Sequence, residues 1–87
     1  MTDYQSFLDS KTIIRVMEKF IQYPWGISVM AEVMGLPKVL VERIYRTLDS
    51  WGVIAFGPHK MRLVVDPLVA LTIVRKRLES IDASYHS

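Results

Sequence analysis

The basic side chains of this 87-residue chain are unevenly distributed along the sequence. The segment from Leu36 to Val65 contains five lysine or arginine residues and two acidic residues, which gives it a net charge of +3. The rest of the chain carries six basic and seven acidic residues, a net charge of −1. Clustered basic side chains attract phosphate groups and other anions. The charge pattern therefore indicates a polyanionic partner for the central third of the chain.

The sequence offers few groups for catalysis or metal binding. It contains no cysteine, so disulfides, thiolate zinc sites and cysteine nucleophiles are excluded, and its two histidines are His59 and His86. Asp9, Glu18 and Glu32 fall on different faces of the expected helices and form no carboxylate pair for acid–base chemistry. A glycine-rich phosphate loop is also missing. We therefore expect no enzyme activity, no metal and no cofactor.

Composition indicates one folded domain over residues 1–87. Hydrophobic residues make up 51% of the chain, at or just above the globular norm of about 45–50%, and this excludes intrinsic disorder. The polar, acidic N-terminus does not resemble a signal peptide. The most apolar stretch, Leu63 to Val74, is interrupted by Asp66-Pro67, and a membrane span needs roughly 18 apolar residues. We therefore expect an intracellular protein with no membrane partner.

Apolar residues at helical spacing predict two helices in the first 35 residues. Ser6-x-x-Asp9 is a capping box that opens the first helix, and Pro24 ends it. Ser28 caps a second helix that runs to about Met34. Gly35 supplies a residue with positive φ at its end, and the chain then turns directly into a third helix.

The third helix is followed by a change from helical to extended periodicity. Pro37 suits the first turn of this helix, and Gly52 stops it. Its apolar residues recur at spacings of 3, 4 and 3, at Val41, Ile44, Leu48 and Trp51. Residues 53–56 and 61–65 are rich in β-branched and aromatic side chains, and residues 57–60 form a turn between them. The sequence therefore predicts a β-hairpin directly after the third helix.

The second and third helices have the pattern of a helix-turn-helix unit. Ala31 is the small residue where the helices cross, Gly35 is the turn, and Val41 and Ile44 follow the turn by six and nine positions. With the hairpin behind it, this unit resembles the winged helix-turn-helix superfamily, and residues 13–65 are similar to the DNA-binding domain of IclR-type and MarR-like regulators. The residues that carry this similarity are Gly35-Leu36-Pro37-Lys38, Val41, Arg43, Thr47-Leu48 and Gly52-Val53-Ile54. The predicted fold class is α+β, mainly α: three helices, a β-hairpin wing and a C-terminal helix.

The resemblance implies sequence-specific binding of double-stranded DNA by a cytoplasmic, nucleoid-associated transcriptional regulator. The recognition helix, about residues 37–51, would enter the major groove, and the wing, residues 56–62, would contact the backbone or the minor groove. The implied DNA-binding residues are Ser28, Lys38, Val39, Glu42, Arg43, Arg46, His59, Lys60 and Arg62. Arg43 and Arg46 would reach base edges or phosphates, and Ser28 a phosphate at its helix N-terminus.

Two of these residues have alternative roles. Glu42 either accepts a hydrogen bond from a cytosine amine or orients Arg46 four residues along the helix. Val39 either contacts a thymine methyl group or lies in a protein interface. The alternative function is therefore a winged-helix protein-interaction module within a larger complex, with Val39, Leu40 and Trp51 as its apolar docking residues.

A fourth helix is predicted to begin at Asp66-Pro67 and to run to about Ile81, with residues 83–87 frayed. Its apolar residues are spaced 3, 4 and 3, as in a coiled-coil seam, and we expect a homodimer built by residues 67–81 with help from the first helix. The predicted interface residues are Ile14, Phe20, Leu71, Val74, Leu78 and Ile81. The seam is short enough that it could instead cover the domain's own core. Residues 75–77, Arg-Lys-Arg, are expected on the solvent-facing side of this helix. Because the chain has no room for an effector domain, we expect no small-molecule effector.

Overall fold

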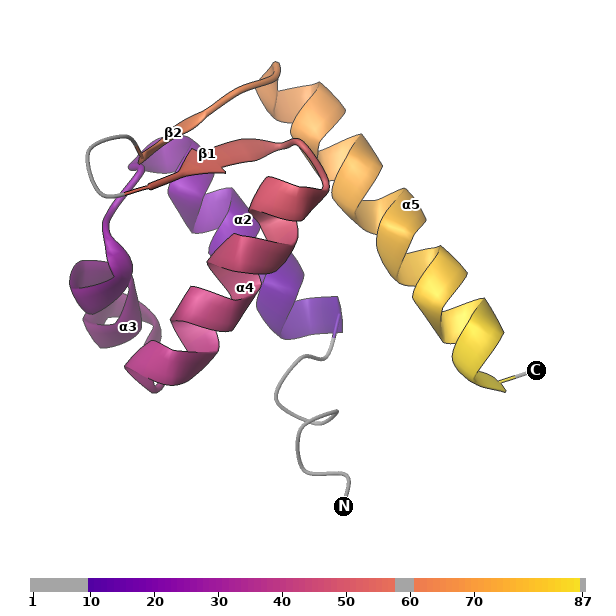
Figure 1. Cartoon of the computed structure of the whole chain (residues 1–87), viewed down its shortest axis with the longest axis horizontal. Coiled ribbons are helices and arrows are strands. Elements are labelled where there is room, and N and C mark those ends of the chain that lie inside the picture. The colour runs from indigo at the N-terminus through magenta and orange to yellow at the C-terminus, as the bar shows by residue number, and fades with distance from the viewer. Residues whose placement is uncertain (1–9, 58–60, 87) are drawn as a thin grey trace.

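Four helices and a two-stranded antiparallel sheet make up the described part of the chain (Figure 1). The computed structural model describes residues 10–57 and 61–86, with side chains described as far as residue 80. The elements, in chain order, are α2 (Ser10–Gln22), α3 (Ile27–Met34), α4 (Lys38–Ser50), β1 (Ile54–Phe56), β2 (Met61–Leu63) and α5 (Pro67–His86). The prediction of a mainly helical α+β fold is confirmed, and so is the predicted order of helices and hairpin. The capping box at Ser6 and Asp9 lies outside the described residues.

The segment between α2 and α3 departs from the sequence prediction in one respect. Gly26, and not Ser28, is the N-cap of α3: it is extended, with φ −69° and ψ 177°, and no side chain caps the helix. The carbonyl oxygen of Gly26 already accepts a hydrogen bond from the Met30 N–H at 3.0 Å, so the helix begins two residues earlier than predicted. The Ser28 side chain therefore lies inside the first turn of α3, exposed to solvent.

A glycine turn joins α3 to α4. Gly35 has φ 69°, in the left-handed region, as predicted. The N–H groups of Gly35 and Leu36 donate to the carbonyl oxygens of Glu32 (3.4 Å) and Ala31 (2.9 Å), which closes the end of α3. Pro37 is the N-cap of α4 and not its first helical residue, so α4 begins one residue later than predicted.

The hairpin is shorter than the sequence suggests. Strands β1 and β2 have three residues each, and their register pairs Ile54 with Leu63, Ala55 with Arg62 and Phe56 with Met61. Residues 53, 64 and 65 were expected in the strands but lie outside them, although the Val64 N–H still donates to the Val53 carbonyl oxygen at 3.0 Å. Residues 58–60 lie outside the described part of the chain.

Helix α5 is longer than predicted. Asp66 starts it as expected: its Oδ2 accepts from the Leu68 N–H at 3.2 Å, and its carbonyl oxygen accepts from the Ala70 N–H at 2.8 Å. The helix continues to His86, five residues beyond the predicted end at about Ile81. No glycine or proline follows Pro67, so nothing in the sequence interrupts the helix.

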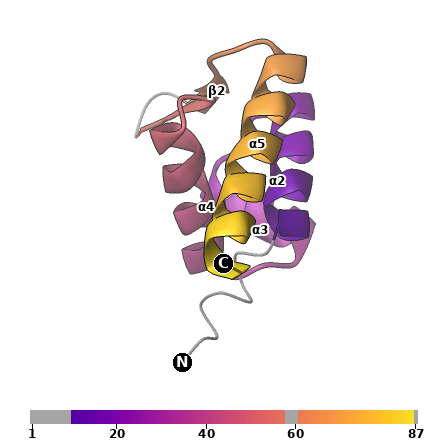
Figure 2. The same ribbon diagram turned by 90° about the vertical axis from the view of Figure 1, so that its right-hand side faces the viewer.

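The core draws on every helix and on β1, and α5 closes it by packing alongside α2 (Figure 2). Three of the residues predicted for a dimer interface belong to this core: Phe20, Val74 and Leu78 are buried within a single chain. Within this single chain, these three side chains expose almost no surface that a second copy could contact. Ile14 and Leu71 are partly buried against the same core, and the Ile81 side chain lies outside the described residues.

Candidate nucleic-acid interface

Helix α4 has one buried face and one exposed face. Its buried side chains are Leu40, Val41, Ile44, Tyr45 and Leu48. On the opposite face Lys38, Val39, Arg43 and Arg46 are exposed and Glu42 is half-buried. The structure therefore brings the five α4 residues predicted for DNA contact onto one outer surface. Leu40, named as a docking residue for the alternative function, is a core residue instead, and Trp51 is half-buried.

Arg46 is held on two sides although its side chain is 68% exposed. Its Nε and Nη2 atoms both donate to Oε2 of Glu42, at 3.1 and 2.8 Å. Its guanidinium carbon lies 5.8 Å from the centre of the Phe56 ring, within the range of a cation–π contact. Of the two roles predicted for Glu42, the structure thus shows the ion pair with Arg46.

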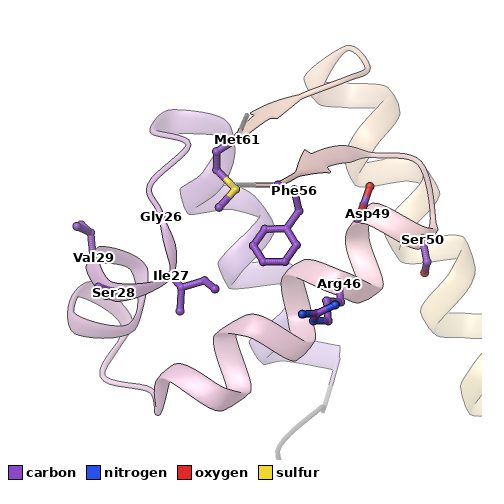
Figure 3. Close-up of a pocket in the computed structure, with 10 residues that line it drawn as sticks. Gly26, Ile27, Ser28, Val29, Arg46, Asp49, Ser50, Phe56 and Met61 are labelled. Carbon is purple, nitrogen blue, oxygen red and sulfur yellow. The ribbon is translucent and has the colours of Figure 1, made fainter. Parts of the chain in front are cut away.

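Phe56 projects from β1 toward α4, where it meets Arg46 and Tyr45 (Figure 3). The Phe56 and Tyr45 rings are edge to face, 5.7 Å apart at 69°, and Tyr45 is edge to face with Phe20 at 5.4 Å and 82°. The Tyr45 hydroxyl donates to the Trp25 carbonyl oxygen at 2.7 Å. Burial raises the pKa of this phenol well above its usual value, because the charged form would lose its hydration. The ring under Arg46 is therefore anchored to the core.

An open groove of about 750 Å³ lies between the N-terminal turn of α3, the C-terminal half of α4 and the hairpin (Figure 3). Ser28, Arg46, Asp49 and Ser50 supply its polar groups, and Ile27, Val29, Phe56 and Met61 supply its apolar ones. The first turn of α3 faces this groove, and the N–H groups of a first helical turn have no partner within the helix. Ser28, the predicted phosphate contact, and Arg46 therefore line the same groove.

The hairpin carries one described basic residue, which does not line this groove. Arg62 lies on β2, opposite Ala55 in the register, and its side chain is exposed. His59 and Lys60, the other residues predicted for the wing, lie outside the described part of the chain. Two acidic side chains of α4, Glu42 and Asp49, partly offset the basic ones. Base readout and phosphate binding are both within the chemistry of this surface.

Sequence reasoning did not name Asp49, and it included Phe56 and Met61 only within the predicted wing, residues 56–62. Asp49 follows Arg46 by three residues and Glu42 by seven, so helical periodicity could have placed it on the outer face. Phe56 and Met61 are paired across the hairpin, and only the way the hairpin folds back over α4 brings them to Arg46.

The exposed large hydrophobic side chains are distributed over several elements of the described chain. Val29 and Val33 lie on α3, and Val39 lies on α4 with 67% of its surface exposed. Val64 follows β2, and Leu68 and Val69 lie in the first turn of α5. Tyr23, which is also exposed, stacks on Trp25 with ring centres 5.1 Å apart.

Searches over the described residues found no helix long and apolar enough to cross a membrane and no cluster of three or more metal-ligating side chains. No protein-family model, curated protein or solved structure matches this chain.

Proposed function

We propose that this chain binds double-stranded DNA as a winged helix-turn-helix protein, with α4 as the recognition helix and the β1–β2 hairpin as the wing. The observation that carries the proposal is the exposure of Lys38, Arg43, Arg46 and Arg62 on α4 and β2, while the opposite face of α4 is buried. A basic ridge that lay against the protein's own core would exclude the proposal. The exposure of this face leaves Lys38 accessible to phosphates, while Arg46 is exposed within its ion pair with Glu42.

The dimensions of α4 support an approach to the major groove. A helix of 13 residues is about 20 Å long and, with side chains, roughly 10–12 Å wide. The major groove of B-DNA is about 12 Å wide and admits one helix. The N-terminal turn of α3 lines the protein's own groove next to α4. Its N–H groups, which have no partner within the helix, would meet the DNA backbone there. The proposed role is a transcriptional regulator, acting on DNA in the cytoplasm.

A homodimer remains part of this proposal, with its interface moved. Phe20, Val74 and Leu78 lie in the core, and we place the surface for a second copy at the exposed apolar residues Leu68 and Val69, which lie on the same helix as the predicted seam. Two recognition helices would then address half-sites roughly 34 Å apart.

The experiment that tests DNA binding is a salt titration of the binding constant on duplex DNA. For the wild-type chain, the logarithm of affinity should fall linearly with the logarithm of salt concentration, by about 0.9 for each phosphate neutralised. Replacement of Arg43 and Arg46 by Ala should abolish specific binding, with the helical circular dichroism spectrum unchanged. The matched control replaces Arg75 and Arg77, two exposed arginines of α5, and should retain wild-type affinity. Equal affinity of the two double variants would reject α4 as the recognition helix.

The alternative function is a protein-interaction module, and the exposed Val39 favours it. This side chain stands on the outer face of α4 with 67% of its surface exposed, and two further valines are exposed on α3. Docking through apolar side chains is nearly independent of salt, because it releases no counterions. If α4 serves DNA, a Val39→Ser chain should keep the wild-type slope of duplex affinity against salt, because Val39 neutralises no phosphate. If α4 serves protein, the same chain should lose its partner.

A further inference from the structure

The Glu42–Arg46 pair differs in charge from the exposed basic residues Lys38 on α4 and Arg62 on β2. Lys38 and Arg62 are exposed cations whose charge attracts phosphates at a distance. Arg46 instead shares its charge with a carboxylate at 2.8 Å, so the pair as a whole is neutral. A neutral pair adds little to the attraction of a phosphate backbone. In a DNA-binding protein, this pair would therefore contribute through directed hydrogen bonds from the Arg46 guanidinium.

The geometry of Arg46 leaves directed hydrogen bonds available. A guanidinium carries five N–H donors in a plane, and here one from Nε and one from Nη2 are bound to Glu42. The remaining donors include those of Nη1, and they lie along a free edge of the same plane. Guanine offers two adjacent acceptors, O6 and N7, in the major groove, and the planar fork of arginine matches them. A phosphate would accept the same donors but would also be repelled by the Glu42 carboxylate.

Phe56 restricts Arg46 further. Its ring lies against the guanidinium at 5.8 Å and is itself fixed edge to face on the buried Tyr45. An arginine with a free side chain loses much rotamer freedom when it binds a base. Because the ion pair and the ring already restrict Arg46, part of this loss is incurred on folding. The arrangement also couples the wing strand to the recognition helix.

We propose that Arg46 is the base-reading residue of this protein, specific for guanine, and that Glu42 and Phe56 are the positioning residues that aim it. The inference rests on the proposed DNA binding and assigns separate tasks within that surface. Lys38 and Arg62 contribute phosphate contacts, and therefore salt dependence. Arg46 contributes discrimination between bases.

The test starts from selection of bound duplexes out of a random pool by the wild-type chain. Equilibrium binding is then measured for the selected duplex and for duplexes with each guanine pair replaced by an adenine pair. The wild type should prefer guanine by about ten- to hundredfold at one position of each half-site. Arg46→Lys keeps the charge but loses the fork, and it should reduce that preference to below about threefold.

The positioning residues are tested in the same assay. Glu42→Gln and Phe56→Leu should each weaken the guanine preference several-fold at the position that Arg46 reads. The Lys38→Ala comparison should show the opposite pattern: the guanine preference stays, and the slope of affinity against salt falls by about 0.9. Circular dichroism checks folding, and Glu42→Gln, a change on the outer face, keeps the test valid if Phe56→Leu does not fold.

The outcomes separate this inference from the proposed function. An Arg46→Lys chain that retains the wild-type guanine preference overturns the assignment of Arg46 as the base reader. Unchanged preference in both Glu42→Gln and Phe56→Leu overturns their positioning roles. A wild-type chain that binds duplexes without preferring guanine at any position rejects the inference and leaves DNA binding intact. A wild-type chain that binds no duplex rejects the proposed function together with the inference.

Discussion

Two leucines of α5 distinguish the chain's own core from a surface open to a second copy. Leu78 is 6% exposed and packs in the core, whereas Leu68, in the first turn of the same helix, is 74% exposed. Truncation of a buried leucine removes its burial energy and leaves a cavity, at a cost of about 2–5 kcal/mol. For a domain of this size, each kcal/mol lowers the melting temperature by about 4–8 °C. Leu78→Ala should therefore melt at least about 8 °C below the wild type.

Leu68→Ala is the matched control, since it makes the same chemical change on the same helix. Exposed substitutions change stability by less than about 0.5 kcal/mol, so the isolated chain should lose almost nothing. The assay is urea unfolding followed by circular dichroism at several protein concentrations, with sedimentation velocity at each. If two copies pair through the start of α5, Leu68→Ala should lower stability only at the higher concentrations, where the wild type is dimeric.

The concentration series also supplies the result that would refute this reasoning. A loss for Leu78→Ala that disappears on dilution would show that Leu78 lies between two chains and not in one core. A loss for Leu68→Ala as large as that for Leu78→Ala in dilute solution would show that the start of α5 is covered by the chain itself. A wild type that stays monomeric at every concentration would reject the homodimer.

Two further predictions concern the backbone turn and the buried phenol. Gly35→Ala should lower the free energy of unfolding by about 1–2 kcal/mol. The cost comes from the backbone φ of 69° alone, because an added Cβ meets no atom within 4 Å. Gly35→Asn should cost less, and equal melting temperatures for both variants and the wild type would contradict this prediction. The raised pKa of Tyr45 means that the folded chain keeps its phenol protonated where the unfolded chain ionises, near pH 10. This contribution to stability is complete below about pH 10 and is lost as pH rises further, by up to about 1.4 kcal/mol per pH unit. Urea midpoints at pH 8 and pH 11 should therefore differ more for the wild type than for Tyr45→Phe, and equal differences would contradict the prediction.

Periodicity identified the helices correctly but could not say what covers their apolar faces. The stripe of α5 was expected at Leu71, Val74, Leu78 and Ile81, facing either a second copy or the domain's own core. In the structure Ala70, Val74 and Leu78 are the buried residues, at a spacing of four, and they lie in the core that α5 shares with α2. An apolar stripe facing another helix of the same chain has the same period as one facing a partner. The choice between them depends on tertiary packing, and the local sequence does not contain it.

Helix starts show a related limit. Ser28 has the side chain preferred at an N-cap, and this preference places the start of α3 two residues late. Gly26 takes that position because Pro24 and the hydrogen bond from the Trp25 N–H to the Tyr23 carbonyl oxygen, at 2.7 Å, turn the chain before Ser28 is reached. The i,i+4 pairing of Glu42 with Arg46, in contrast, was expected from spacing alone, because it needs only the helix that contains both residues.

The contacts around Arg46 imply that base preference and stability can be separated at some positions and not at others. Glu42 and Arg46 face solvent, so substitutions there change the aim or the donors of the guanidinium and should leave the core intact. Tyr45 lies between them in the helix but points inward, where it contacts Phe20, Phe56 and the Trp25 carbonyl oxygen. A change at Tyr45 therefore loosens the core and also the ring that supports Arg46. If DNA recognition uses this support, Tyr45→Phe, which keeps the ring and loses the hydroxyl, should weaken folding more than it weakens base preference.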